Sequence, residues 1–590
     1  MRHLLTFLAC LSSVSCASSP EAAPPSAAST PGQQAKVDSG GVADTNAVSR
    51  RSPIAPDVAE WAAAGGAGVQ VIAVHVRPPE VDLDFPDHEL GGAIIDGKVV
   101  SRRIDGVEKS AEEADDFNAT FHDAIRARNR ERNARAAESL RALAQEFDAE
   151  VVWVDGAYGA VSIAADDVAR LLEARPTAFS LVEFEGTKTD TVDLTSALES
   201  MDITPTASNL GYDGTDVGAW MNDGDGRPDE SNAAIDAGDF TMVYSGGDSI
   251  TQHATQMVAD IMAAAPDVEV FWAKGVLSCR LRDDVDTMGS PSVFVSSLSS
   301  NSYTLDGTYT SCSEDWDEYV YDFRVAHFQA AGNSVNCADT SGNLWIADRA
   351  KGYNVIAAGG YDDGANPEEI WSGSCWKDPE TQASKPEVVA PAVNIVSAGF
   401  SANNGTSHSA PLMAGLTASL MEPYSHLRLR PEAVKAYLMS GAREMNTANA
   451  TMVKEKEGAG RVNFGNSYYN GYYHGWSGSP TAYFSSDSDS DGKNDVVESY
   501  PLVSGRTYRV VIAWLVRGTY VTANLEPNFD FNLQVRNPSG TVVASSASTQ
   551  QSFEAVEFTA STSGTYTFTI DRASYSSTAG NLALALHVSW

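Results

Sequence analysis

The hydrophobic positions in the N-terminal third of the chain follow two different periods. Short runs of apolar residues predict strands, and two charged stretches with apolar residues at helical spacing predict helices. The expected strands are 69–76, 151–154, 159–163 and 179–185, and the expected helices are 120–147 and 165–173. The resulting order β-α-β-β-α-β predicts a ferredoxin-like α+β unit over residues 65–190.

The pattern changes between about residues 200 and 468, where apolar β-type runs alternate with apolar helical ones. Strands are expected at 214–222, 268–273, 292–295, 327–331 and 354–358, and helices at 254–265, 410–422 and 431–440. This alternation predicts an α/β domain, with a parallel sheet covered by helices on both faces. After residue 470 the helical pattern stops, and short alternating strands between Gly, Pro, Ser and Asn turns predict an all-β sandwich over residues 470–590.

The first residues have the layout of a secretory signal. Arg2 and His3 precede an apolar run that is followed by small residues, so residues 1–16 are expected to direct export. The run SVSC resembles a lipoprotein cleavage box, which leaves two alternatives: lipid on Cys16, or removal of the signal near Ala17 without an anchor. Residues 17–60 are rich in Ala, Ser and Pro and predict a disordered linker. The expected location is the medium or the cell envelope of a bacterium.

Charge and cysteine content restrict the possible partners. With 78 acidic and 40 basic residues the chain has a formal charge of −38, which repels nucleic acid and anionic lipid. Membrane contact is therefore expected only through lipid on Cys16, and we expect a monomer. Beyond the signal there are four cysteines, which are Cys279, Cys312, Cys337 and Cys375. They lack C-x-x-C spacing, which disfavours zinc, and they allow three disulfide pairings in an oxidising compartment.

Three segments carry the residue types that acyl transfer by a serine requires. Ser407, in the run GTSHSAP, stands between a glycine turn and a helix, His253 begins an apolar helix, and Asp223 ends a strand-like run. A hydroxyl nucleophile, an imidazole base and a buried carboxylate that fixes the imidazole tautomer are the parts of a catalytic triad. Singly, each residue has an ordinary explanation as a helix cap, a structural histidine or a turn residue. Asp225 and Asp229 lie near Asp223 and are alternatives for the carboxylate, but the count from Gly214 favours Asp223.

Taken together, in the order Asp, His, Ser, these segments resemble the signature blocks of the subtilisin-like serine proteases, the subtilase or peptidase S8 family. Four further segments between about 200 and 465 resemble blocks of this family: SLS at 297–299, AAGN at 330–333, KPEVVAP at 385–391 and GAGRVN at 458–463. The chain departs from the family at two blocks, with Asp-Gly-Asp in place of Asp-Ser/Thr-Gly and His-Ala-Thr in place of His-Gly-Thr.

The resemblance implies a secreted endopeptidase that works through an acyl-enzyme. In this mechanism His253 takes the proton of Ser407, and Asp223 orients the imidazole. The side-chain amide of Asn333 is expected to donate to the oxyanion. The substrate, a protein or peptide, is expected to contact Ser297, Leu298, Ser299, Ala331 and Gly332.

The resemblance also implies that residues 65–190 are a propeptide, which would assist folding and inhibit the enzyme until the chain is cut between about 186 and 205. The alternative for this unit is a permanent accessory domain. For the whole chain the alternatives are a catalytically inactive surface or adhesion protein with the subtilase fold, and an esterase with the same triad.

An acidic run after residue 486 has the ligand spacing of a twelve-residue calcium loop. The expected oxygen ligands for Ca²⁺ are Asp487, Asp489, Asp491, Asp495 and Glu498, with Gly492 at the sixth position. The alternative is a solvated linker, because no flanking helices are evident in the sequence.

Overall fold

The computed structural model of the chain describes residues 69–76, 88–110, 113, 117, 293–296 and, with gaps, 138–184, 194–274 and 309–590. All of these belong to one compact unit, Arg50–Trp590. The expected signal, the expected linker and most of the helix predicted at 120–147 lie outside the described residues. Within the described part of the chain, no helix has both the length and the hydropathy needed to cross a membrane.

Four strands of the N-terminal third form a sheet of their own, and they match the four predicted strands. They are β1 (Val69–Val76), β5 (Glu150–Asp155), β6 (Tyr158–Ala164) and β7 (Phe179–Phe184). Their order is β5-β6-β1-β7, and each pair of neighbours is antiparallel.

A second N-terminal segment forms part of a different sheet. Strands β2 (His88–Ile95), β3 (Lys98–Ile104) and β4 (Val107–Glu108) are joined by two Asp-Gly turns. All four turn residues have positive φ, at 49° and 72° for Asp96 and Gly97 and at 50° and 75° for Asp105 and Gly106, as type I′ hairpin turns require. β2 pairs with β18 (Gly471–Gly478) of the C-terminal domain. The prediction of a single N-terminal unit over 65–190 is therefore wrong for residues 88–108.

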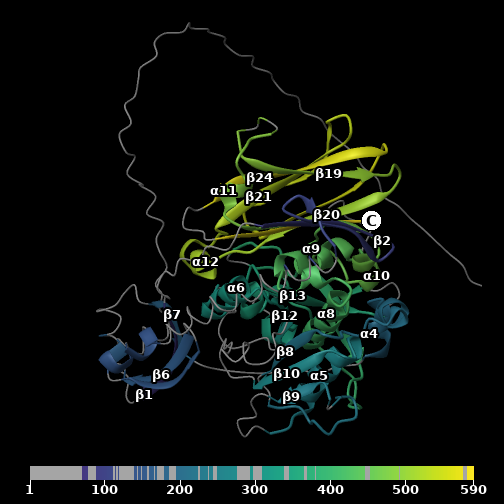
Figure 1. Cartoon of the computed structure of the whole chain (residues 1–590). Helices are drawn as coiled ribbons and strands as arrows, with labels where there is room; N and C mark the ends of the chain where they lie inside the picture. The colour runs from purple at the N-terminus through teal and green to yellow at the C-terminus, as the bar shows by residue number, and fades with distance from the viewer. Residues whose placement is uncertain are drawn as a thin grey trace, which may run out of the picture. The chain divides into compact units, whose positions relative to one another are not determined.

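The middle of the chain contains the predicted parallel sheet. Its order is β14-β13-β12-β11-β8-β10-β9, with β15 also paired to β13, and only the short β14 runs antiparallel. The strands are β8 (Gly218–Asp223), β9 (Phe240–Met242), β10 (Glu269–Lys274), β11 (Val293–Ser296), β12 (Ala326–Ala330), β13 (Ile356–Asp362), β14 (Glu369–Ile370) and β15 (Val388–Pro391). The main helices are α5 (Gln252–Ala264), α6 (Ser311–Phe323), α8 (Thr406–Met421) and α9 (Pro431–Gly441). Every residue of α8 is buried, so this helix lies at the centre of the domain (Figure 1).

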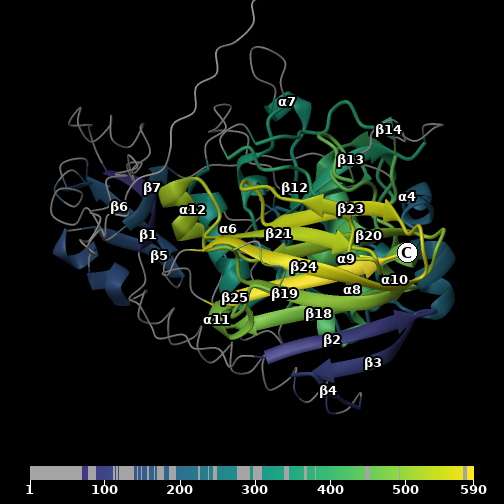
Figure 2. The same ribbon diagram turned by 90° about the horizontal axis from the view of Figure 1, so that it is seen from above.

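The C-terminal region consists of two sheets. A seven-stranded sheet has the order β23-β20-β25-β18-β2-β3-β4, and a four-stranded sheet has the order β19-β24-β21-β22. Their remaining strands are β19 (Asp495–Leu502), β20 (Thr507–Trp514), β21 (Phe529–Arg536), β22 (Val542–Ser546), β23 (Phe553–Thr559), β24 (Gly564–Tyr575) and β25 (Leu582–Ser589). Buried and half-buried residues alternate along β21, because one face lies on the other sheet. Figure 2 shows β2, β3 and β4 continuing the larger sheet beyond β18.

The larger sheet packs on α9 of the middle domain. β25 is buried along its whole length, because α9 covers one of its faces and the smaller sheet the other. At this junction Ser440 Oγ lies 2.6 Å from His587 Nδ1, and the His587 ring stacks on Tyr437 with 3.6 Å between ring centroids. Two short helices that the sequence analysis lacked, α11 (Pro480–Tyr483) and α12 (Gly518–Asn524), occur in this region. Arg517, just before α12, contacts Glu318 at 2.6 Å and Asp322 at 3.0 Å on α6.

We expect His587 to make the protein sensitive to acid. Burial lowers the pKa of His587 to about 3, so the folded protein keeps this ring neutral. The unfolded chain binds a proton below about pH 6.5 and the folded one only below about pH 3, so stability falls as the pH is lowered through this window. The contribution is about 1.4 kcal/mol per pH unit. The free energy of unfolding, measured with urea at several pH values between 4 and 6, should therefore depend on pH less steeply in His587→Asn, by about 1.4 kcal/mol per pH unit. An equally steep pH dependence in the variant and the wild type would contradict this role of His587.

Candidate active site

The carboxylate of the candidate site comes from the centre of the parallel sheet. β8 lies between β11 and β10 and is parallel to both, and its last residue is Asp223. Ligand and catalytic sites of such sheets form at the carboxyl ends of the strands. Asp223 is fully buried at this edge. Asp225 and Asp229 are the alternative carboxylates that the sequence offers. Asp225 lies outside the described residues, and Asp229 accepts hydrogen bonds from the backbone and hydroxyl of Ser231.

The imidazole lies directly against this carboxylate. His253 is the second residue of α5, whose N-terminal cap is Thr251, with its hydroxyl accepting from the Ala254 N–H. The Nδ1 atom of His253 contacts Oδ2 of Asp223. A carboxylate on Nδ1 fixes the tautomer that carries the proton there, and this leaves Nε2 as the basic nitrogen.

The candidate nucleophile begins the central helix. Ser407 is the second residue of α8 and is 3% exposed. Pro411 lies four residues later and has no N–H, so the helix offers no ordinary hydrogen bond to the Ser407 carbonyl. The nucleophile is thus held in the first turn of a buried helix, where backbone N–H groups point toward the N-terminal end.

Packing of α5 against α8 brings the histidine and the serine segments together. Gly415 of α8 allows close approach, because a Cβ there would lie 2.5 Å from the Cβ of Ala264. The residue after Ser407 is His408, and its Nδ1 contacts Oδ2 of Asp260 on α5. The rings of His408 and His253 lie edge to face, with 6.2 Å between centroids. This second Asp–His pair was missed by the sequence analysis. The only signal for it was a histidine within a serine motif that precedes an apolar helix.

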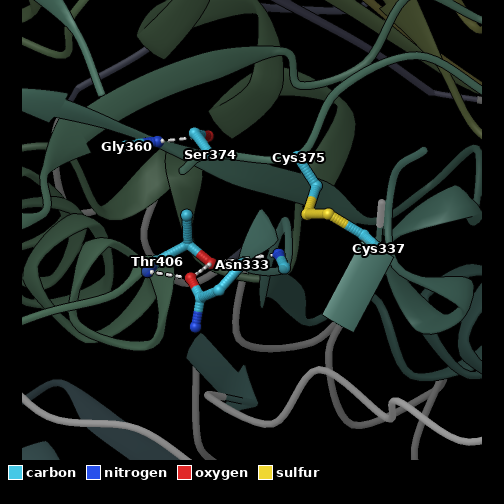
Figure 3. The surroundings of a disulfide bond; sticks show 7 residues. Asn333, Cys337, Gly360, Ser374, Cys375 and Thr406 are labelled. Carbon is cyan, nitrogen blue, oxygen red and sulfur yellow. Dashed lines mark hydrogen bonds between the residues drawn. A yellow bond between two sulfur atoms is a disulfide. The ribbon is translucent and has the colours of Figure 1, made fainter. Parts of the chain in front are cut away.

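Asn333 lies beside the same helix terminus. Its Oδ1 accepts hydrogen bonds from the Thr406 N–H at 2.9 Å and from the Thr406 hydroxyl at 3.1 Å (Figure 3). A backbone N–H can only donate, so the atom that faces it is the amide oxygen. The amide NH₂ of Asn333 therefore points away from Thr406. The Thr406 hydroxyl in turn accepts from the Gly332 N–H at 3.0 Å, which ties the residue before Asn333 to the helix that carries Ser407.

A disulfide braces the Asn333 segment. Cys337, the last residue of α7 (Ser334–Cys337), is bonded to Cys375, with 6.4 Å between the Cα atoms (Figure 3). The residue before Cys375 is Ser374, which forms a β-bridge with Asn333. The sequence allows three disulfide pairings, and the structure contains the one in which Cys337 is joined to Cys375. Cys312 is also disulfide-bonded.

The expected substrate contacts are only partly described. Ser297, Leu298 and Ser299 lie outside the described residues. Ala331 and Gly332 are buried next to Asn333, and Gly332 has a φ of 104°, a conformation that favours glycine. A Cβ on Gly332 would lie 3.0 Å from the Cβ of Ala347, so a side chain there would require Ala347 to shift.

The described members of the expected calcium loop are engaged by protein atoms. Asp487 accepts from the backbone N–H groups of Ser490 and Gly492, and Asp495 accepts from Ser488. Glu498, the expected twelfth-position ligand, instead contacts His474. Asp489 and Asp491 lie outside the described residues. The described residues therefore do not fit the predicted ligand set at its last position.

Glu498 belongs to a cluster with Glu89 and the buried His474, in which both glutamates are partly exposed. His474 Nε2 lies 2.7 Å from Glu89 Oε1, and its Nδ1 lies 3.1 Å from Glu498 Oε1. Burial opposes protonation of His474, but the two carboxylates outweigh it and raise its pKa. The three side chains are close enough to share a metal ion. Each carboxylate faces a different ring nitrogen, however, and this is the arrangement of an imidazolium between two anions.

The comparison with known families agrees with this geometry. Residues 229–460 match the subtilase family, peptidase S8. The match includes His253, Asn333 and Ser407 and begins after Asp223. Residues 229–460 therefore form a subtilase domain, the domain of the subtilisin-type serine proteases.

Three solved structures illustrate the likeness. Fervidolysin from Fervidobacterium pennivorans, a keratinolytic enzyme related to subtilisin, is 14% identical with a TM-score of 0.43, over 84% of this chain and 73% of its own. The prenylagaramide maturation protease PagA is 19% identical with a TM-score of 0.36, over 45% of this chain and 98% of its own. The Clostridium perfringens CspB protease is 14% identical with a TM-score of 0.37, over 46% of this chain and 98% of its own. Among curated proteins no match is found. The assignment rests on the family match.

Proposed function

We propose that this protein is a secreted serine endopeptidase, made as a precursor, that hydrolyses peptide bonds through Asp223, His253 and Ser407. The observation that carries the proposal is the contact of the buried Asp223 carboxylate with His253 Nδ1. The histidine in this contact belongs to the helix that packs on the helix of Ser407. Acyl transfer needs an imidazole held in one tautomer, and Asp223 supplies the group that holds it.

In the proposed mechanism, His253 Nε2 accepts the hydroxyl proton of Ser407 while Oγ attacks the peptide carbonyl. The imidazolium that forms is stabilised by Asp223, which stays ionised. As the tetrahedral intermediate collapses, His253 gives the proton to the leaving amine, and an acyl-enzyme remains. Water, deprotonated by His253, then attacks the ester carbonyl and frees the carboxylic acid and the Ser407 hydroxyl.

The oxyanion of the intermediate is assigned to the Asn333 amide. Thr406 donates to the oxygen of this amide, and the NH₂ group is the part of a carboxamide that can donate to an oxyanion. Because Thr406 directly precedes Ser407, the same two hydrogen bonds fix the donor relative to the nucleophile. A preorganised donor of this kind contributes about 3–4 kcal/mol to transition-state stabilisation in enzymes of this class.

The precursor proposal rests on the N-terminal four-stranded sheet. The order β5-β6-β1-β7 with antiparallel neighbours is the order expected for a split βαβ unit. The cut that separates this sheet from the protease domain is placed before α4 (Thr195–Ser200). Ala197, Met201 and Ile203 are buried in the main hydrophobic core, so a cut between 195 and 205 would remove core residues.

Secretion of the protein and binding of calcium are proposals that rest on sequence patterns. The signal-like residues 1–16 and the lipoprotein-like Cys16 support a secreted or envelope-bound monomer. Calcium at the acidic loop is supported only by ligand spacing, and Glu498 is engaged by His474.

A fluorophosphonate probe tests the proposal directly. Such probes phosphonylate activated serines, so purified protein cut before residue 194 and on both sides of residues 88–108, which lets the N-terminal sheet leave, should be labelled at Ser407, as located by mass spectrometry. Ser407→Ala should abolish labelling. Ser409→Ala is the matched control, because Ser409 Oγ donates to the backbone carbonyls of Ala390 and Pro391 and should not react.

Two results would count against the proposal. Failure of both the precursor and the cut protein to react would favour a catalytically inactive protein with the subtilase fold. Labelling that survives in Ser407→Ala would assign the nucleophile to another residue.

A further inference from the structure

The hairpin of residues 88–108 is built into the C-terminal sheet along its whole first strand. β2 pairs with β18 in continuous antiparallel register, from Ser477 opposite His88 to Gly471 opposite Ile94. At the turn, the Gly97 N–H donates to the Tyr469 carbonyl at 2.8 Å. Near the first residue of β2, Oε1 of Glu89 lies 2.7 Å from Nε2 of His474 on β18. Hydrogen bonds therefore join the hairpin to the C-terminal domain along its whole edge.

The hairpin also contributes to the main hydrophobic core. Leu90, Ile94 and Ile104 are buried to 3%, 1% and 6% exposure, in the same core cluster as residues of α8 and α9. The fit is tight, because a Cβ on Gly92 would lie 2.4 Å from the Tyr473 hydroxyl, and one on Gly97 would lie 2.1 Å from the Tyr468 ring. Removal of the hairpin would expose apolar surface on both partners.

Without the hairpin, β18 would be an edge strand. Its eight residues, GYYHGWSG, include three aromatic side chains and carry no charged side chain besides His474. A long, apolar edge with unpaired backbone groups recruits other strands and promotes aggregation, and proteins normally cover or charge such edges. In this chain β2 provides the cover.

We infer that residues 88–108 are a permanent strand pair of the C-terminal domain, so that maturation gives a two-chain enzyme that retains its N-terminal segment. This inference rests on the proposed cut before α4, and it differs from the usual expectation that a propeptide leaves after cleavage. The hairpin and the four-stranded sheet belong to the same N-terminal fragment. A single cut before α4 therefore leaves that sheet tethered to the enzyme through the hairpin.

Tethering has a consequence for inhibition. A tethered domain acts at an effective concentration on the order of mM, so dilution does not remove it. A single cut in the linker would then not free the N-terminal sheet. Full release would need two further cuts, one on each side of the hairpin, because β1 precedes the hairpin and β5, β6 and β7 follow it.

The test separates retention from activity. A site for a sequence-specific protease is inserted between residues 186 and 193 of the Ser407→Ala chain, which cannot process itself. After complete cleavage, the N-terminal fragment should co-elute with residues 194–590 in equimolar amount on size exclusion at neutral pH, and it should separate only in denaturant. Elution of the fragment by itself from the native cut protein would overturn the inference.

A matched pair of variants identifies the hairpin as the attachment. Leu90→Asp together with Ile94→Asp places charges in the core and should cause loss of the fragment after cleavage. Val100→Asp on β3 is the control, because Val100 is 59% exposed, and it should retain the fragment. Retention in the core variant would show that other contacts hold the fragment, and this would overturn the role of the hairpin.

Hydrogen exchange on the cut chain gives a readout that does not depend on these variants. The backbone amides of β18 should exchange as slowly after cleavage as before it. Fast exchange confined to β18 would show that β2 has left, and would overturn the inference. Because Ser407 is absent throughout, a negative result leaves the fluorophosphonate test of the protease function unaffected.

Discussion

Replacing Asp223 by asparagine is expected to lower kcat/KM for peptide hydrolysis by about 10⁴-fold while the fold is retained. The asparagine side chain can offer its NH₂ group to His253 Nδ1, which favours the tautomer with the proton on Nε2. The histidine would then present a donor to Ser407 where catalysis requires an acceptor. In addition, the imidazolium that forms during attack would lose the buried carboxylate that now contacts it.

Asp229→Asn is the matched control for this prediction. Asp229 lies on the same acidic segment, and its carboxylate accepts from the Ser231 N–H at 3.0 Å and the Ser231 hydroxyl at 2.6 Å. We expect its kcat/KM to stay within a few-fold of the wild type, because this carboxylate contacts a turn and not His253. Steady-state hydrolysis of a chromogenic peptide by both variants decides the matter. A loss in Asp229→Asn as large as in Asp223→Asn would show that the triad carboxylate had been assigned to the wrong aspartate.

The triad segments could be predicted from the sequence because each is marked locally. Asp223 ends an apolar run, His253 begins a helix and Ser407 follows a glycine, and the order of the three adds information that none has alone. From the sequence, Asp223 is favoured over Asp229 only by its distance along the chain from Gly214. Only the structure shows which carboxylate reaches the imidazole.

The hairpin was missed although its turns were visible. Asp96-Gly97 and Asp105-Gly106 between alternating residues are strong local signals for β-hairpins. Its partner strand, however, begins more than 370 residues later, at Gly471, and no local pattern specifies a pairing over that distance. The same limit explains Glu498. Its spacing fits a calcium loop, but the spacing does not reveal that His474 of another strand contacts the Glu498 carboxylate.

A buried charge cluster of the middle domain could not be predicted either, since its members come from separate elements. The Glu387 carboxylate is 1% exposed and accepts from Lys385 Nζ at 2.7 Å, from Lys435 Nζ at 3.1 Å and from the Ala357 N–H at 2.9 Å. Glu387 directly precedes β15, and Lys435 is on α9. Burial lowers the pKa of Lys435 to about 8 against the opposing effect of Glu387, so the carboxylate is what keeps this ammonium group charged.

Replacing Glu387 by glutamine is therefore expected to lower the free energy of unfolding by about 3–5 kcal/mol, because two buried ammonium groups lose their common anion. Glu455→Gln is the control, since Glu455 is 62% exposed and pairs with Lys377 at 3.6 Å on the surface. A surface pair of this kind contributes less than about 1 kcal/mol. Urea unfolding of both variants in the Ser407→Ala background, where self-cleavage cannot distort the transition, measures the difference. The double variant Glu387→Gln with Lys435→Met should recover part of the lost stability, because it no longer buries the Lys435 charge without its anion. If the two single variants are equally stable, Glu387 does not hold the two lysines in the folded protein.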